Sequence, residues 1–214
     1  MLSLHNTPKR TPAFETRRLQ VLASAARVFC AVGYDKASMR RIAAEARVSL
    51  AGIYHYVASK EELLYSIQLH TFDSLLRGLH ESVEGIDDAR ERFGAAVRNH
   101  VRHFGENMHE LKVCARELET LEGEAYDEVH ARRRAYFEAV HELVRELRSP
   151  SIGGSGSGSW LATANLFGML NWFYQWYDAE RARVSLDELA AQQTALFLDG
   201  FFGSDFSGDS GAHG

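Results

Sequence analysis

The sequence has few of the residues that fix a fold covalently or through a metal ion. It contains only two cysteines, Cys30 and Cys114, in 214 residues, and neither belongs to a CxxC or Cys/His motif. This pattern fits reduced, structural thiols better than a disulfide framework or a zinc site. The alternative is a redox-sensing role for one of them.

Other absences exclude whole classes of protein. No useful stretch alternates between apolar and polar residues, so β-strands are not expected. The sequence has no Gly-rich phosphate loop, no GxSxG or HExxH motif and no carboxylate constellation with catalytic spacing, so we expect no enzyme activity. No secretory signal is recognisable near the N-terminus, which predicts a cytoplasmic protein.

One segment approaches the properties of a membrane span. Residues 160–177 carry no formal charge, and their length is near the lower limit for crossing a bilayer. The amides of Asn165, Asn171 and Gln175 would be costly in lipid. We therefore interpret this segment as a helix buried in protein or at a subunit interface, and we expect no membrane partner.

The sequence does have an uneven distribution of charge. The whole chain carries −5, but residues 1–60 hold ten basic side chains against three acidic ones, a balance of +7 that leaves −12 for the remainder. A basic head on an acidic body suggests a polyanion partner for the head. The alternative is a solvated surface that is simply uneven in charge.

Helical patterns fill the first sixty residues. Apolar residues repeat at helical spacing over about 15–32, and Gly33 then provides a stop signal. Ser38, Ser49 and Ser59 each precede a run typical of a helix start, so each is a predicted N-cap. Two short helices joined by a tight turn and packed on a longer one form a helix-turn-helix.

Five short motifs follow one another in this region. They are Gly33-Tyr34, Ser38-Met39-Arg40-Arg41-Ile42-Ala43, Val48-Ser49, Gly52-Ile53-Tyr54-His55-Tyr56 and Ser59-Lys60-Glu61-Glu62-Leu63. Their order and spacing over about 17–65 resemble the DNA-binding motif of the tetracycline-repressor (TetR) family. The sequence departs from the usual pattern at Ala37, Arg41, Arg47 and Tyr56-Val57. Arg47 replaces the turn glycine, so we expect it to adopt a positive φ at some energetic cost.

The resemblance implies that the second short helix enters the major groove of DNA. Groove geometry then places Leu50 and Ala51 near thymine methyl groups, while Gly52 allows close backbone approach. The predicted DNA-binding residues are Ser38, Arg40, Arg41, Ser49, Leu50, Ala51, Gly52, Tyr54, His55 and Lys60. Four of them, Ser38, Arg40, Tyr54 and Lys60, are assigned to phosphates by the family motif. Packing against the first helix is the alternative for Tyr54 and for Tyr56.

Apolar spacing predicts six further helices, so the expected fold is all-α with about nine helices. They cover 60–81, 87–107, 108–121, 123–148, 160–179 and 185–202, with a flexible Gly/Ser-rich loop at 149–159. The predicted organisation is a flexible arm over 1–13, a three-helix helix-turn-helix domain over 14–60, a helical ligand-binding and dimerisation domain over 61–202 and a disordered tail over 203–214.

The last two predicted helices are apolar over much of their surface, and the final one contains Phe197 and Phe201. A monomer would struggle to bury both helices. The resemblance to the TetR family implies that they pair with their symmetry mates in a four-helix dimer interface. An internal core is the alternative, although a reader of two DNA half-sites also needs to be a dimer.

Two polar residues interrupt apolar helix faces in the body. Arg133 falls within the apolar stripe of helix 123–148, so its guanidinium needs an anion, either Glu117 or Glu119 or a ligand. His100 lies in the stripe of helix 87–107. His100 and His103 are spaced as metal ligands but lack a third, so we expect a hydrogen-bonded interior histidine and no metal.

The segment 168–177, Gly-Met-Leu-Asn-Trp-Phe-Tyr-Gln-Trp-Tyr, is similar to the branch of the TetR family that responds to acyl-CoA thioesters; the similarity covers roughly 105–180. An aromatic helix beside an inward arginine offers an apolar slot for an acyl chain and a cation for its anionic end. The predicted ligand-binding residues are His100, Arg133, Tyr136, Asn171, Trp172, Gln175 and Trp176. A dimer core is the alternative for the aromatic residues.

The sequence thus predicts a repressor that binds a palindromic double-stranded DNA operator as a homodimer. A small-molecule effector, an acyl-CoA in the first instance, is expected to release it, and no cofactor is expected. The alternatives are a TetR-type regulator of a different apolar or aromatic ligand and a DNA-binding activator without a ligand.

Overall fold

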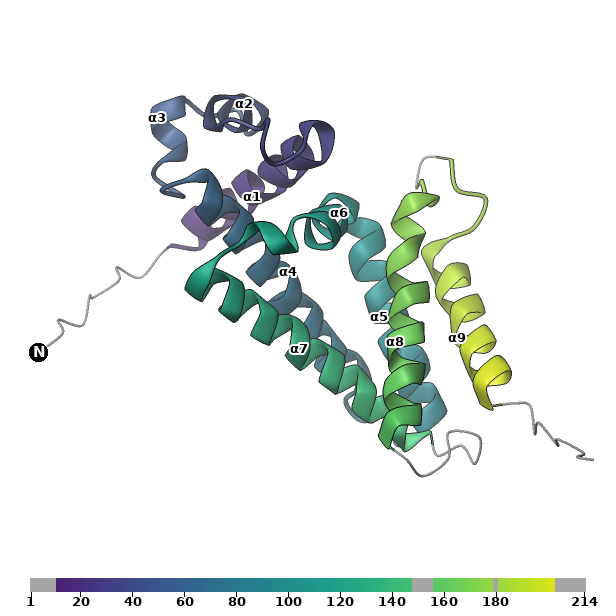
Figure 1. Ribbon diagram of the computed structural model, residues 1–214. Coiled ribbons are helices and arrows are strands. Elements are labelled where there is room, and N and C mark those ends of the chain that lie inside the picture. The colour runs from purple at the N-terminus through teal and green to yellow at the C-terminus, as the bar shows by residue number, and fades with distance from the viewer. Residues whose placement is uncertain (1–10, 148–155, 179–180, 203–214) are drawn as a thin grey trace, which may run out of the picture.

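The computed structural model describes residues 11–147, 156–178 and 181–202. Within these ranges every regular element is a helix, which confirms the all-α prediction (Figure 1). The α-helices are α1 (Pro12–Val32), α2 (Met39–Glu45), α3 (Leu50–Ile53), α4 (Lys60–Val83), α5 (Ala89–Glu106), α6 (Met108–Arg116), α7 (Gly123–Glu146), α8 (Gly156–Trp172) and α9 (Leu186–Phe202). Two 3-10 turns cover Leu118–Thr120 and Phe173–Gln175.

Several helix boundaries differ from the predicted ones. Helix α1 begins at Pro12, inside the predicted arm, because Thr11 caps it through a hydrogen bond from the backbone N–H of Phe14. Helix α8 begins at Gly156, so the end of the predicted loop 149–159 is helical. The rest of the arm and of the loop, and the predicted tail, fall outside the described ranges.

Helices α1–α3 form a head at one end of the molecule, and α4 leads from the head into the body (Figure 1). One core cluster lies under the head and extends along α4 to Phe72, with Cys114 and Val129 from the body. A second cluster begins at Leu75 of α4 and continues through α5, α7, α8 and α9. Helix α4 therefore carries side chains of both cores.

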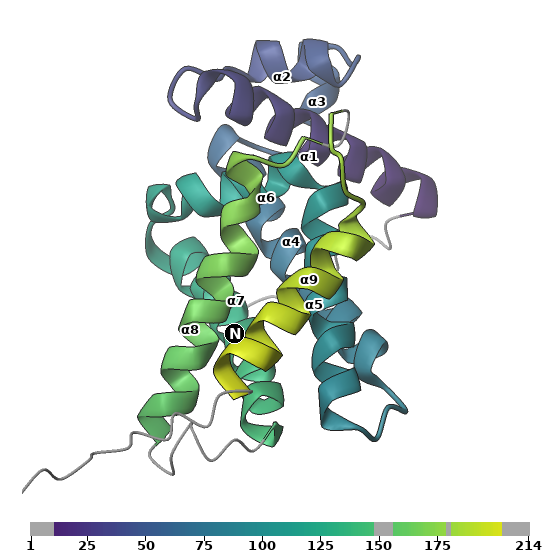
Figure 2. The ribbon, with the colours of Figure 1, turned by 90° about the vertical axis from the view of Figure 1, so that its right-hand side faces the viewer.

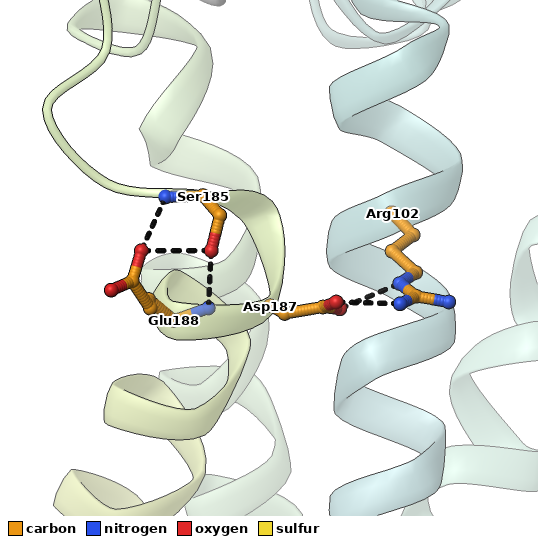
Figure 3. Close-up of polar contacts among 4 residues, drawn as sticks. All are labelled: Arg102, Ser185, Asp187 and Glu188. Carbon is orange, nitrogen blue, oxygen red and sulfur yellow. Dashed lines mark hydrogen bonds and ion pairs between the residues drawn. The ribbon is translucent and has the colours of Figure 1, made fainter.

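Helix α9 is fixed to α5 at its first turn. The hydroxyl of Ser185 accepts a hydrogen bond from the backbone N–H of Glu188 at 3.2 Å, and the Glu188 carboxylate accepts one from the Ser185 N–H at 2.7 Å (Figure 3). Next to this capping box, the Arg102 guanidinium donates two hydrogen bonds of 2.6 Å to Asp187. Both partners are about half-exposed, so solvent screens this ion pair and its contribution to stability is small.

Helices α8 and α9 form one outer face of the body. Figure 2 looks onto this side, and both helices lie in front of the others. Large apolar side chains of α8, of the turn after it and of α9 are exposed: Trp160, Leu161, Trp172, Trp176 and Leu196 are each more than half exposed. No helix in the part of the chain that the structure describes is long and apolar enough to cross a membrane.

Phe197 does not belong to this outer face. Its side chain is buried and stacks on Phe93 of α5 with ring centroids 5.0 Å apart. The prediction that placed Phe197 in a subunit interface was wrong, because the apolar pattern signals burial but not which helix provides it. Phe201 lies in α9, but its side chain is outside the described part.

Candidate functional site

The two short helices of the head each start at a serine. The Ser38 hydroxyl accepts a hydrogen bond from the N–H of Arg41 at 3.3 Å, and the Ser49 hydroxyl accepts one from Gly52 at 2.9 Å. The Ser59 hydroxyl caps α4 in the same way, at 3.1 Å from the N–H of Glu62. These contacts confirm the three predicted N-caps, and each satisfies a backbone donor that has no partner within its helix.

The turn between α2 and α3 has a left-handed residue. Arg47 has φ of 54°, and no other non-glycine residue in the described ranges has a positive φ. This confirms the positive φ that we expected because Arg47 stands where the family pattern has a glycine. The guanidinium of Arg17, on α1, donates to the carbonyl oxygens of Ala46 and Arg47 at 3.1 and 3.3 Å and so braces the turn. Sequence reasoning missed Arg17, which lies about thirty positions before these acceptors.

Most predicted DNA-binding residues lie on the outer surface of α2 and α3. The exposed ones are Ser38, Arg40, Arg41, Ser49, Leu50, Ala51, Tyr54 and His55. Gly52 is half-buried, and a Cβ there would lie 3.0 Å from the Ser49 hydroxyl oxygen, so its lack of a side chain also makes room for the cap. Tyr56 packs on Phe14 of α1 with ring centroids 5.2 Å apart, as its alternative reading expected.

The basic residues of the head fall into two sets. One set makes contacts inside the protein: Arg27 pairs with Glu45 at 2.7 Å, Arg18 donates to the hydroxyl of Ser66 at 2.9 Å, and Arg17 braces the turn. The other set has exposed side chains that make no hydrogen bond or ion pair within the described ranges: Lys36, Arg40, Arg41 and Arg47. This second set leaves positive charge beside the exposed face of α3.

Lys60 also makes contacts inside the protein. Its ammonium group donates to the carbonyl oxygen of Tyr34 at 3.1 Å and lies 4.1 Å from the centroid of the Tyr34 ring. The hydroxyl of Tyr34 in turn donates to the Glu61 carboxylate at 3.2 Å. Lys60 therefore has a structural role at the base of the head, and its predicted phosphate contact stays a prediction.

The body contains a cavity of about 380 Å³ between α4, α5, α6, α7 and α8. Its lining is mostly aromatic and aliphatic: Phe72, Leu75, His100, Phe104, Leu111, Cys114, Ala115, Arg133, Tyr136, Phe137, Ala164, Phe167 and Asn171. Phe72 and Cys114 belong to the core cluster under the head, whereas Leu75 and Leu111 belong to the cluster of the body. The cavity thus lies where the two cores meet.

His100 and Tyr136 form a buried polar pair in the cavity wall. The Nδ1 atom of His100 is hydrogen-bonded to the Tyr136 hydroxyl at 3.0 Å. Only 1% of the His100 surface is exposed, and this burial lowers its pKa to about 3, so the ring is neutral. Burial also raises the pKa of the Tyr136 hydroxyl, which stays protonated. His100 is the hydrogen-bonded interior histidine expected from the sequence.

Arg133 lines the same cavity but is not buried. Its side chain is exposed, so it marks a place where the cavity reaches solvent. No carboxylate in the described part of the chain forms an ion pair with it, and Glu117 is instead hydrogen-bonded to Thr120. The expected burial of the guanidinium and the alternative in which Glu117 or Glu119 pairs with it were wrong, because Arg133 lies at the solvent edge of the stripe; the ligand anion stays a prediction.

Of the remaining predicted ligand-binding residues, one lines the cavity and three do not. Asn171 lines the cavity. Trp172, Gln175 and Trp176 do not line it; all three are exposed, Trp172 by 61% and Trp176 by 56%. Phe137, Phe167 and Phe104 supply the aromatic lining in their place. Helical spacing did not show which aromatic residues face the cavity, because both sides of α8 carry aromatic residues.

Metal coordination finds no support in the described side chains. No group of three or more histidine, cysteine, aspartate or glutamate side chains among them can hold a metal ion. His103 lines a different cavity, with His70 and Glu110, near α1. Cys30 and Cys114 are both free thiols, and burial raises the pKa of Cys30 to about 11 and of Cys114 to about 12.

Two family models match the chain in series. The model described as "Bacterial regulatory proteins, tetR family" matches residues 21–67. The model described as "Tetracyclin repressor-like, C-terminal domain" matches residues 87–201, more than half of the chain. The first match covers the helix-turn-helix, and the second covers most of the body.

Known proteins resemble part of the chain in sequence or most of its fold in structure. The transcriptional activator FasR of Mycolicibacterium smegmatis is 36% identical over 83 residues, which span 39% of this chain and only 38% of FasR. A TetR-family regulator from Bordetella parapertussis 12822 is 29% identical with a TM-score of 0.80, over 89% of this chain and 98% of that one. AibR, solved with isovaleryl coenzyme A and operator DNA, is 26% identical with a TM-score of 0.72, over 84% and 97%.

Proposed function

Because the chain belongs to the tetracycline-repressor family of bacterial regulatory proteins, we propose that it binds a palindromic DNA operator as a dimer and leaves it when a small molecule fills the body cavity. The observation that carries the DNA-binding part is the surface of the head. Helix α3 and the turn that follows it expose Leu50, Ala51, Tyr54 and His55 beside unpaired arginines of α2 and of the turn before α3. The side chains of Leu50, Ala51 and His55 suit base edges, and Tyr54 and the arginines suit phosphates.

The outer face of α8 and α9 supports the proposed dimer. Trp160, Leu161, Trp172, Trp176 and Leu196 are large apolar side chains that one subunit leaves more than half exposed. A symmetric pair of such faces buries them and gives two heads related by a twofold axis. Two heads can then contact half-sites about one helical turn apart, which is the arrangement that a palindrome requires.

An acyl-CoA thioester is the proposed effector. The apolar lining of the cavity suits an acyl chain, and the exposed guanidinium of Arg133 at its edge suits a phosphate or carboxylate. AibR, which shares the fold, was solved with isovaleryl coenzyme A. A cavity of about 380 Å³ encloses the acyl end only, so the nucleotide end extends past Arg133 into solvent.

The position of the cavity gives a physical route for release. Phe72 and Leu75 of α4 line it, and the same helix starts at Lys60, which is bound to Tyr34 of the head. Leu111 and Cys114 place α6 in the cavity wall, and α6 packs directly on α1. A ligand that separates α4 from α6 therefore changes the angle of the head. Release follows if the ligand favours a body in which the two α3 helices no longer match adjacent grooves.

Selection from a random pool of DNA duplexes tests the proposal without knowledge of the operator. We expect the protein to enrich an inverted repeat, and we expect Arg40→Ala to weaken its binding and to reduce the salt slope by about one counterion. Arg134→Ala, at an exposed arginine of α7, is the control and should change neither. Failure to enrich any sequence over competitor DNA would refute the DNA-binding proposal.

Activation is the second candidate, because FasR, which is 36% identical over 39% of this chain, is named an activator. A promoter that carries the selected sequence distinguishes the two in transcription with purified polymerase. Repression predicts less transcript when the protein is added and recovery when the effector follows. Activation predicts more transcript.

A further inference from the structure

The cavity wall contains a buried polar atom that has no hydrogen-bond partner among the described residues. This atom is Nε2 of His100, whereas Nδ1 of the same ring is bonded to Tyr136. The Asn171 side chain and the Leu170 carbonyl lie near the ring, but neither makes a hydrogen bond of normal geometry to Nε2. An unsatisfied buried polar group destabilises a protein, so its presence calls for an explanation.

The surroundings of His100 direct this atom toward a ligand. His100 lines the cavity, and the rings of Phe104 and Phe167 lie against it with centroids 4.9 and 5.9 Å away. A phenyl ring has no polar group that can form a hydrogen bond with Nε2 of His100. Asn171 of α8 lines the same cavity and supplies an amide with both a donor and an acceptor. The wall therefore presents these two polar groups, from α5 and α8, beside the Tyr136 hydroxyl and the Arg133 guanidinium in a pocket whose other lining is mostly apolar.

A hydroxyl group is the ligand chemistry that fits this pair. The Tyr136 hydroxyl fixes one nitrogen of a neutral ring, which leaves Nε2 as a donor in one tautomer and as an acceptor in the other. A hydroxyl serves either tautomer, because it both donates and accepts, and Asn171 can meet its remaining need. A hydrocarbon chain offers Nε2 no partner in either tautomer, and a thioester carbonyl offers one only in the tautomer that carries the proton on Nε2.

We propose that the effector carries a hydroxyl group on the part enclosed by the cavity, hydrogen-bonded to Nε2 of His100 and to Asn171, in addition to an anionic end at Arg133. The chemical class is a short or aromatic hydroxyacyl thioester, or the corresponding hydroxy acid. The volume sets an upper size: a cavity of about 150 Å³ encloses benzene, and this one is about 380 Å³. This inference rests on the proposed function of the same cavity.

Calorimetry with matched ligand pairs tests the inference on the full-length protein. The pairs are 3-hydroxybutyryl-CoA with butyryl-CoA and 4-hydroxybenzoyl-CoA with benzoyl-CoA, together with the four free acids. We expect the hydroxylated member of at least one pair to bind tenfold or more tightly, which corresponds to about 1.4 kcal/mol. In His100→Phe that preference should fall below about twofold.

Two further variants keep the test interpretable. His103→Phe replaces another histidine of α5 that lies outside the cavity lining, and it should keep the preference. Asn171→Leu should reduce it, and this variant stands in for His100→Phe if the latter fails to fold by circular dichroism.

The outcomes separate the two proposals. Equal affinity within every pair overturns the hydroxyl inference while leaving the acyl-CoA proposal intact. Binding of the hydroxy acids but of no thioester supports the hydroxyl inference and overturns the acyl-CoA effector. If no member of the panel binds, both are wrong.

Discussion

The head and the body cavity differ in what positions their functional side chains. In the head, Ser38 and Ser49 fix the starts of α2 and α3 through contacts within three residues along the chain. In the cavity, His100 and Tyr136 come from α5 and α7 and lie 36 positions apart. The helix starts of the head are thus set by local hydrogen bonds, and the polar pair of the cavity by long-range packing. The comparison predicts that single changes cost little at the caps and the turn of the head and much in the core of the body.

The largest expected effect is at Phe197. Phe197→Asp places a carboxylate in the stack with Phe93, so we expect the free energy of unfolding to fall by at least about 3–5 kcal/mol. That is a large fraction of the stability of a typical domain. Thermal and urea denaturation measure it.

Leu196→Asp is the matched control for Phe197→Asp. Leu196 is the preceding residue and is 63% exposed on the outer face of α9. This variant should fold normally and sediment as a monomer, because its charge lies in the proposed dimer face. A folded, stable Phe197→Asp protein would break the comparison, and a dimeric Leu196→Asp protein would contradict the placement of the interface.

The next largest effect is the pH dependence of stability, which belongs to the body. Burial lowers the pKa of His100 to about 3 and that of His103 to about 4, below the ordinary value of 6.5. Above pH 6.5 these groups are neutral in both states. As the pH falls from 6.5 toward 4, the unfolded chain takes up protons that the folded chain does not. The free energy of unfolding therefore decreases with falling pH.

Urea denaturation at several pH values isolates the contribution of His100. Removal of this histidine in His100→Phe should flatten the slope by up to about 1 kcal/mol per pH unit. Tyr136→Phe keeps the buried histidine, so it should keep the slope of the wild type. Identical slopes for wild type and His100→Phe would show that His100 is not buried in a neutral state.

The sequence predicted the head better than the cavity for the same physical reason. The three serine caps and the positive φ of Arg47 follow from neighbouring residues, and the structure confirms them. The partner of Phe197 and the outward direction of Trp172 depend on packing between distant helices, and helical spacing did not specify them. The resemblance to the TetR family supplied the fold and the DNA-binding role, but it did not predict that Arg17 braces the turn.

A smaller effect is expected from the cap of α3. Ser49→Ala removes the acceptor for the Gly52 N–H from a helix of only four residues, so we expect a loss of about 1 kcal/mol and weaker DNA binding. Ser49→Thr keeps a hydroxyl and should retain most of both. Urea denaturation and fluorescence anisotropy with the selected duplex measure the two effects. If Ser49→Ala loses as much stability as Phe197→Asp, the head is not locally organised.

The smallest expected effect is a gain of stability at the turn. Arg47→Gly relieves the left-handed conformation at φ of 54° and should stabilise the protein by about 1 kcal/mol or less. Arg41→Gly is the matched control, because Arg41 is an exposed arginine within α2, and it should destabilise by about 1 kcal/mol. Loss of stability in both variants would mean that Arg47 is held by contacts that outweigh its strain.

The proposed release of DNA requires that the cavity of the body and the DNA-binding face of the head be coupled. Anisotropy of the selected duplex, titrated with protein at increasing concentrations of the tightest-binding ligand of the panel, measures this coupling. We expect at least a tenfold loss of DNA affinity at saturating ligand, about 1.4 kcal/mol of coupling, and an equal loss of ligand affinity when DNA is bound. A ligand that occupies the cavity and leaves the affinity for DNA unchanged would refute the coupling.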